Sequence, residues 1–221
     1  MRNSKTLIAA ALVASPLMGT WSAWAAPCVT DSVTAYTASG FSCTVDGLTF
    51  SNIVVNTTTN GGGTVTLGNI TPFISGNEFG LTLNYTALAS APGSSADLAW
   101  TYNIVGSGIT DAFLALAGNT TGSGQSQVSE VLDNGTTLSL LAPGSTTATF
   151  APINSLAVMK DQINFVGATP GTAAASLVTN AFSLGTSPPP PSPVPEPTSI
   201  AVLGSALVGM GLLGRWRRKD V

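Results

Sequence analysis

Short runs of alternating apolar and polar residues dominate the chain between residues 26 and 185. In the two clearest runs, residues 79–86 and 97–105, nearly every second side chain is apolar. This period of two is typical of strands with one buried face and one solvated face. Turn sequences such as those at 60–63 and 133–135 separate the runs at intervals of roughly ten to fifteen residues. The pattern predicts an all-β domain, an antiparallel β-sandwich of the jelly-roll or Ig-like kind with about ten or eleven strands.

The N-terminal residues 1–25 follow a different pattern. Arg2 and Lys5 precede a short apolar stretch, and the small residues Ala23 and Ala25 follow it. This arrangement is typical of a secretory signal peptide, and it predicts cleavage after Ala25. The alternative is a first membrane anchor, which the shortness of the apolar stretch disfavours.

The C-terminal part of the chain divides into three segments. Residues 186–197 are rich in proline, which predicts an extended polyproline linker. Residues 198–214 are uncharged and largely apolar, and they predict a single transmembrane helix. Residues 215–221 carry a basic cluster, which is expected to stay in the cytoplasm and to stop transfer.

This three-part tail resembles the PEP-CTERM sorting signal of exported bacterial proteins. The resemblance implies recognition by exosortase, a membrane-embedded cysteine transpeptidase, and a Gram-negative host that makes extracellular polysaccharide. It implies that the sorting motif consists of Pro195, Glu196 and Pro197. The stop-transfer residues would be Arg215, Arg217, Arg218 and Lys219.

Two inner segments are also similar to one group of PEP-CTERM proteins. GFSCTVDGLTFSN at 40–52 resembles that group's G-x-x-C-T-x-G-D-x-T-F-S-N segment, although Asp46-Gly47 stands where Gly-Asp is usual. FAPINSLAVMKD at 150–161 resembles the group's F-x-P-V-x-S-L-x-V-x-K-D strand. The resemblance implies no particular biochemical activity.

Residues 26–185 form the predicted exported domain, and their charge is one-sided. Eight carboxylates stand against the single base Lys160, so the net charge is −7. Nucleic acids are bound through clustered lysine and arginine, which this domain lacks, and no nucleic-acid partner is expected. Cys28 and Cys43 are an isolated pair in an exported domain, which predicts a disulfide. Because the chain contains no histidine, a metal site built on the two cysteines is disfavoured, and no metal or cofactor is expected.

Few residues of the domain carry candidate chemistry. Lys160-Asp161 is either a contact site or a local ion pair at a strand end, and the ion pair is favoured. Trp100 and Tyr102 share one strand face. They either stack on a sugar ring or pack in the core, and packing in the core is favoured. Asp133-Asn134-Gly135 predicts a turn before it predicts a calcium ligand set.

These observations together favour an exported, non-enzymatic protein with a structural or interaction role at the cell surface or in the extracellular matrix. The precursor is expected to be anchored in the inner membrane by its C-terminal helix before processing by an exosortase-type enzyme. The alternative is a carbohydrate-binding module of the exopolysaccharide matrix, with exopolysaccharide as its partner. Exposure of Trp100 or Tyr102 would favour binding, and burial would favour the structural role.

Overall fold

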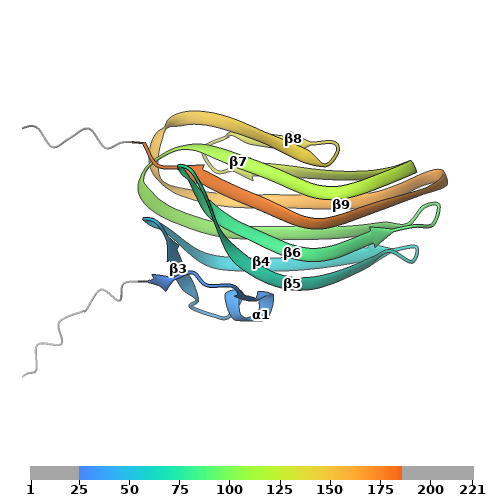
Figure 1. Ribbon diagram of the computed structural model, residues 1–221, viewed down its shortest axis with the longest axis horizontal. Coiled ribbons are helices and arrows are strands. Elements are labelled where there is room, and N and C mark those ends of the chain that lie inside the picture. The colour runs from blue at the N-terminus through green and yellow to red at the C-terminus, as the bar shows by residue number, and fades with distance from the viewer. Residues whose placement is uncertain (1–24, 186–221) are drawn as a thin grey trace, which may run out of the picture.

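The computed structural model describes residues 25–185, which fold almost entirely into β-strands (Figure 1). In chain order the elements are β1 (Ala26–Pro27), β2 (Asp31–Ser32), α1 (Val33–Tyr36), β3 (Ser42–Val45), β4 (Leu48–Asn60), β5 (Thr64–Ser75), β6 (Glu78–Ala89), β7 (Ser95–Leu132), β8 (Thr137–Leu140) and β9 (Gly144–Ser183). The all-β expectation is confirmed for this part of the chain.

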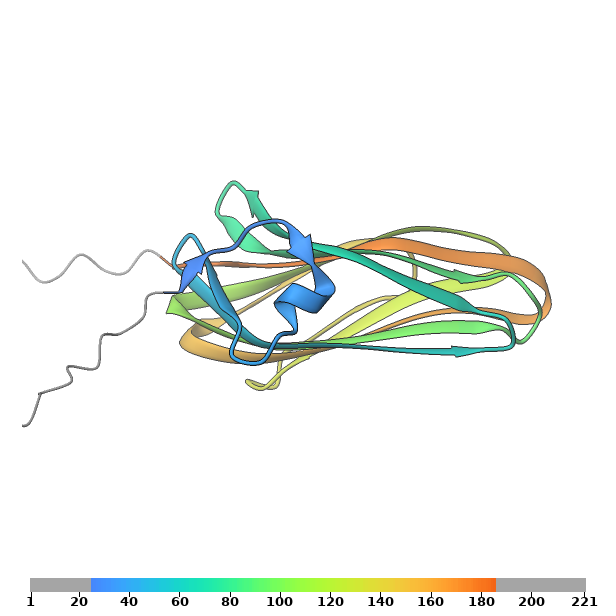
Figure 2. The same cartoon turned by 90° about the horizontal axis from the view of Figure 1, so that it is seen from below.

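The strands form one continuous sheet in the order β1-β3-β4-β7-β9-β6-β5-β2, and β8 pairs with β7. β7 and β9 are 38 and 40 residues long, and each bends to supply several segments. Residues 95–105 and 124–132 of β7 flank residues 155–166 of β9, whereas residues 113–122 of β7 pair with residues 171–181 of β9. The sheet therefore curls back on itself, and two layers face each other (Figure 2).

We name the layers by their hydrogen-bonded segments. The first layer contains β3, β4 and β8 with residues 95–105 and 124–132 of β7 and residues 155–166 of β9. The second layer contains β2, β5 and β6 with residues 112–122 of β7 and residues 144–149 and 171–183 of β9. Large buried side chains of both layers fill the space between them, among them Phe50, Leu81, Leu83, Leu98, Trp100, Ile104, Leu114 and Phe182.

The structure corrects the expected number of separate strands. Nine strands, not ten or eleven, lie within residues 25–185, because bends join successive segments into the two long strands β7 and β9. Gly108 and Gly122 sit near two of these bends with φ of 71° and 56°, a region that glycine reaches without steric cost. The antiparallel expectation also has one exception, since β1 pairs with β3 in parallel over two residues.

A tight turn joins β3 to β4 within one of the segments that resemble PEP-CTERM proteins. Val45 pairs with Leu48, so Asp46 and Gly47 alone form the connection. Both turn residues have positive φ, 42° and 90°, as a type I′ hairpin turn requires. Asp-Gly is a favoured dipeptide for this turn, and the order found in this chain therefore suits its backbone.

The predicted disulfide is confirmed. Cys28 and Cys43 are bonded, and both side chains are largely buried in the core. The bond holds the segment after β1 against β3, next to the short helix α1. Ser32 caps that helix, because its Oγ accepts a hydrogen bond of 3.2 Å from the amide of Ala35.

The membrane segments of the sequence prediction fall elsewhere in the chain. No helix within residues 25–185 combines the length and the apolarity needed to cross a membrane. The signal peptide at 1–25 (except its last residue), the linker at 186–197, the helix at 198–214 and the basic tail at 215–221 all lie outside the described residues.

Candidate functional site

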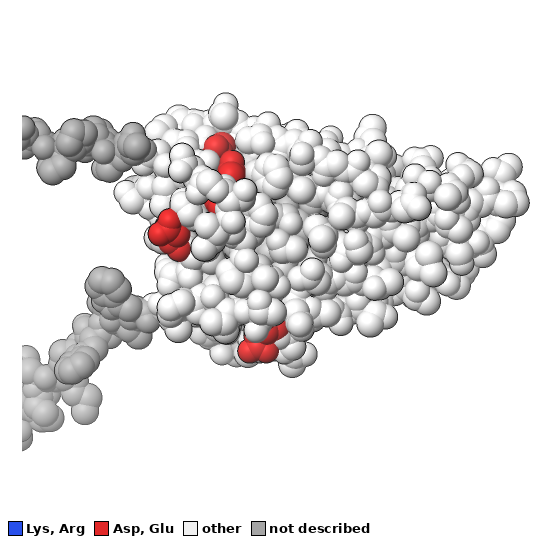
Figure 3. Space-filling model, in the orientation of Figure 1, with Lys and Arg blue, Asp and Glu red and all other residues white. Residues whose placement is uncertain are grey.

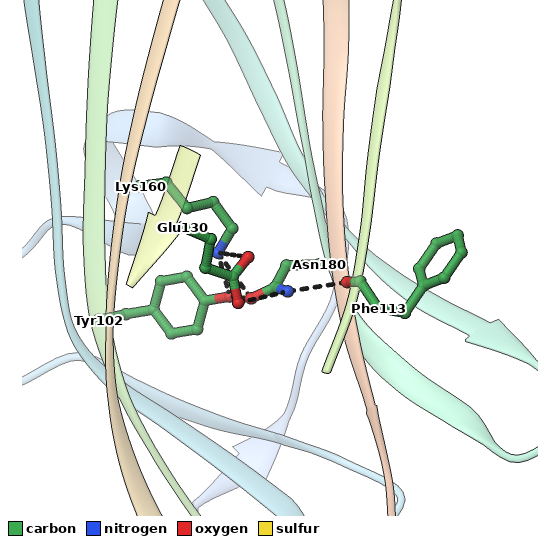
Figure 4. A network of polar contacts seen from close by, with 5 residues as sticks. All are labelled: Tyr102, Phe113, Glu130, Lys160 and Asn180. Atoms are coloured by element: carbon green, nitrogen blue, oxygen red, sulfur yellow. Dashed lines mark hydrogen bonds and ion pairs between the residues drawn. The ribbon is translucent and has the colours of Figure 1, made fainter. Parts of the chain in front are cut away.

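Four polar side chains meet in the core between the two layers (Figure 4). Lys160 of β9 and Glu130 of β7 are cross-strand neighbours in the first layer. Tyr102 comes from the first segment of β7 in the same layer, and Asn180 reaches them from β9 in the second layer. We call Tyr102, Glu130, Lys160 and Asn180 the buried cluster.

The carboxamide of Asn180 is the centre of the buried cluster. Its Oδ1 accepts a hydrogen bond of 2.6 Å from Lys160 Nζ and another from the Tyr102 hydroxyl. Its Nδ2 donates to Glu130 Oε1 at 3.1 Å and to the backbone carbonyl oxygen of Phe113 at 2.8 Å. These four bonds use both donors and both lone pairs of the amide, so its position is fully specified.

The amine of Lys160 also has several contacts within the buried cluster. Its Nζ donates to the Tyr102 hydroxyl oxygen at 2.8 Å and lies 3.5 Å from Glu130 Oε2. It also lies 4.5 Å from the ring centroid of Tyr102 and 4.8 Å from that of Trp100, which places a cation over two aromatic faces. Lys160 is 1% exposed, and Glu130 and Asn180 are 0% exposed, so the buried cluster is closed to bulk water.

Burial moves the pKa values of the acid and the base toward each other. Desolvation lowers the pKa of Lys160 to about 8, although the nearby Glu130 acts in the opposite direction. Desolvation also raises the pKa of Glu130, while Lys160 and the Asn180 amide oppose the rise. Both shifts favour the uncharged pair, a neutral amine beside a protonated carboxyl, over the ion pair.

Both sequence hypotheses for Lys160-Asp161 are wrong. Alternation along β9 sends Lys160 into the core and Asp161 to the exposed outer face, so the two do not form a local ion pair and Lys160 is no surface contact. The partner of Lys160 is Glu130, 30 positions away along the chain. The alternation could have predicted that Lys160 faces the core, because Leu156 and Val158 precede it on the inward face.

The predicted core role of Trp100 and Tyr102 is confirmed. Trp100 is 0% exposed, and its ring packs against that of Tyr102 at a centroid distance of 5.0 Å. Tyr102 in turn contacts Phe50 of β4 at 5.9 Å. Neither side chain reaches the surface, where a sugar would have to stack.

Asp133-Asn134-Gly135 forms the predicted turn between β7 and β8. Gly135 has a φ of 87°, and the amide of Thr136 donates to Asn134 Oδ1 at 2.9 Å. The Asn134 side chain is thereby used within the turn, as is usual for asparagine at such positions. Within residues 25–185 no group of three or more acidic, cysteine or histidine side chains gathers in a metal-binding arrangement.

The outer face of the first layer carries an open hollow of about 280 Å³. Its lining includes Asn52, Thr101, Val131 and Met159, on neighbouring strands. In the first layer, burial and the nearby Asp161 raise the pKa of Asp97 to about 6. Charge is otherwise sparse, and the face in Figure 3 shows a few separate acidic patches and no basic one.

The sequence reasoning missed an aromatic pair on the second layer. Phe73 of β5 and Phe113 of β7 lie in one cross-strand row, separated by Gly80 and Ala181. Their rings are nearly parallel, at 8° and a centroid distance of 6.1 Å, and both are half-buried. The Phe113 ring points away from the buried cluster (Figure 4), so the pair lies on the outer face. Since the two residues are 40 positions apart, only the strand order could reveal them.

The predicted sorting residues are not placed by the structure. Pro195, Glu196 and Pro197 lie outside the described residues, as do the basic residues Arg215, Arg217, Arg218 and Lys219.

Comparison with known proteins assigns no family. No protein-family model matches the chain, and no curated protein matches it either. Among solved structures, the enzymatically active domain of tailspike protein 4 from bacteriophage CBA120 aligns with a TM-score of 0.30 and 16% identity, covering 60% of this chain and 19% of that chain. The chain thus spans about a fifth of the length of that tailspike structure.

Two carbohydrate-binding modules align more weakly. TmCBM61, solved in complex with β-1,4-galactotriose, has a TM-score of 0.26 and 7% identity over 53% of this chain and 87% of that chain. The CBM36-1 domain of a multidomain xylanase from the hindgut metagenome of Trinervitermes trinervoides has a TM-score of 0.19 and 14% identity, over 57% and 98%. Similarity at this level is too low to carry a functional argument.

Proposed function

We propose that this chain is an exported, non-enzymatic protein with a structural or interaction role at the cell surface or in the extracellular matrix. The observation that carries the proposal is the burial of the side chains that had the best chance of contacting a ligand. Trp100, Tyr102 and Lys160 all lie in the core at 2% exposure or less. These side chains stabilise the packing of the two layers and are not available to a ligand, which favours a structural role.

Two further features support export and a role outside the cytoplasm. The Cys28–Cys43 disulfide is the kind of bond that persists in oxidising compartments. The curled two-layer sheet suits the β-sandwich class, and we propose that class for the domain.

The sorting part of the proposal rests on the sequence of the tail. Pro195, Glu196 and Pro197 would be recognised by an exosortase-type membrane transpeptidase, after the helix at 198–214 has anchored the precursor. Arg215, Arg217, Arg218 and Lys219 would hold the end of the chain in the cytoplasm.

Replacing Glu196 with Ala is expected to leave export and folding intact while the uncleaved precursor accumulates in the membrane. Glu196 lies outside the folded domain, so its loss removes a recognition group and no core contact. Mass spectrometry of the C-terminus, in a host that has exosortase, measures the outcome. A surface protein that still carries residues 198–221 in the unsubstituted chain would instead indicate a plain membrane anchor.

A second candidate function is carbohydrate binding in the exopolysaccharide matrix, and the Phe73–Phe113 pair favours it. Two nearly parallel rings on an outer sheet face offer an apolar surface on which a sugar ring can stack. The hollow beside Met159 offers amides and hydroxyls for polar contacts on the other layer.

A glycan array probed with the exported protein separates the two candidates. The structural role predicts no specific glycan signal. Binding that falls at least about tenfold in Phe113→Ala, a loss of about 1.4 kcal/mol, would establish the carbohydrate-binding role instead. Phe165→Ala is the matched control, because Phe165 is also half-buried but lies in the first layer.

A further inference from the structure

The buried cluster places an amine, a carboxamide and a carboxyl group in mutual contact, out of reach of water. We propose that Lys160 and Asn180 become joined by an amide bond between Nζ and Cγ, formed by the protein itself with Glu130 as the proton carrier. The inference rests on the geometry of the buried cluster and is independent of the proposed function.

The amine is positioned to attack the carboxamide. Lys160 Nζ lies 2.6 Å from Asn180 Oδ1, so it is next to the carbon to which that oxygen is bonded. Two strands and the aromatic rings of Trp100 and Tyr102 hold it there. Holding two reacting groups in one small pocket replaces a bimolecular encounter by an intramolecular step, which accelerates such reactions by many orders of magnitude.

The remaining polar groups match the charges that develop during the attack. The Tyr102 hydroxyl donates to Asn180 Oδ1, the atom that becomes negative in the tetrahedral intermediate. Glu130 Oε1 accepts a hydrogen bond from Asn180 Nδ2, the nitrogen that must leave, and Glu130 Oε2 faces Lys160 Nζ at 3.5 Å. The two carboxyl oxygens thus connect the attacking nitrogen to the leaving nitrogen.

The protonation states agree with this role. A lysine amine is a nucleophile only when it is neutral, and burial lowers the pKa of Lys160 to about 8. Burial also raises the pKa of Glu130, so a proton released by the ammonium group is accepted within the pocket.

The reaction balances without a cofactor or a second substrate. The lone pair of Nζ forms a bond to Cγ, and the carbonyl electron pair moves onto Oδ1. Glu130 then delivers a proton to Nδ2 and takes one from Nζ. When the carbonyl re-forms, the Cγ–Nδ2 bond breaks and ammonia leaves. The products are a secondary amide and ammonia, and Glu130 ends as it began.

The bond would tie the two layers together covalently. Lys160 belongs to the first layer and Asn180 to the second, and 20 positions separate them along β9. The reaction would also replace a buried acid–base pair, which is costly to desolvate, by a neutral amide. Unlike the Cys28–Cys43 disulfide, such a link resists reducing agents.

Lys160 offers a direct test, because it is the only lysine or arginine between residues 26 and 214. Trypsin can therefore cut this part of the chain only after Lys160, and only when the amine is free. The full chain is produced with its signal peptide, exported, purified, reduced, denatured and digested. We expect that trypsin does not cut after Lys160. We also expect the mass of the exported chain to be lower, by one ammonia, than the mass calculated from its sequence.

Two variants distinguish the proposed bond from other reactions that release ammonia. Glu130→Gln retains the amine and the amide but loses the proton carrier, so it is expected to keep the ammonia and to be cut. Asn180→Asp is expected to form the same bond, with loss of water in place of ammonia. Cyclisation of Asn180 to a succinimide also releases ammonia, but it leaves Lys160 open to trypsin. Cleavage of the unsubstituted protein at Lys160 overturns the proposal, whatever the mass and however the variants fold.

Discussion

The Glu130→Gln variant is expected to lose about 3–5 kcal/mol of free energy of unfolding at pH 7, because it leaves the Lys160 amine unbonded to Asn180 and buried without its acid. Glutamine has nearly the same shape as glutamate, so the loss reports charge and proton exchange more than packing. Urea unfolding of the purified protein, followed by tryptophan fluorescence, measures the difference. Asp133→Asn is the matched control, since Asp133 is exposed in the β7–β8 turn, and it is expected to change stability by less than about 0.5 kcal/mol.

The Glu130→Gln variant itself is expected to become more stable as the pH rises. Burial already lowers the pKa of Lys160 to about 8, and removal of the Glu130 charge lowers it further. An unfolded lysine has a pKa of about 10.4, so between these values the unfolded chain binds more protons than the folded one. The stability of the variant therefore rises with pH, from below about 8 to about 10.4. A variant that is as stable as the unsubstituted protein at pH 7, or that loses stability over this range, would contradict the expectation.

Trp100→Ala is expected to lower the free energy of unfolding by about 3–5 kcal/mol, because it opens a cavity in the core. Trp100 is fully buried, packs against Tyr102 and covers the Lys160 amine. Trp100→Phe is expected to cost less, since it keeps an aromatic ring and removes an indole N–H that has no hydrogen-bond partner among the described residues.

Met159→Ala is the control for Trp100→Ala. Met159 is the chain neighbour of Lys160 but points outward at 57% exposure, and its removal is expected to change stability by less than about 0.5 kcal/mol. Thermal or urea unfolding of the variants provides the comparison. Equal effects at the two positions would show that Trp100 is not part of the stable core.

The sequence by itself determined the parts of this protein that depend on neighbours along the chain. Alternation at 97–105 identifies Leu98, Trp100, Tyr102 and Ile104 as one face, and the structure buries all four. An isolated cysteine pair in a domain expected to be exported leaves one possible intramolecular disulfide, and it is present. The first feature follows from local geometry, because the side-chain direction in a strand has a fixed period of two. The second follows because the domain contains only two cysteines.

Only the tertiary structure decided which residues meet across the core. Lys160 is the single base among residues 26–185, and sequence proximity alone predicts its chain neighbour Asp161 as its partner. Its actual partners, Glu130 and Asn180, depend on how the long strands β7 and β9 bend between the two layers. Those bends are set by the packing and register of the whole sheet, which no local pattern of residues specifies.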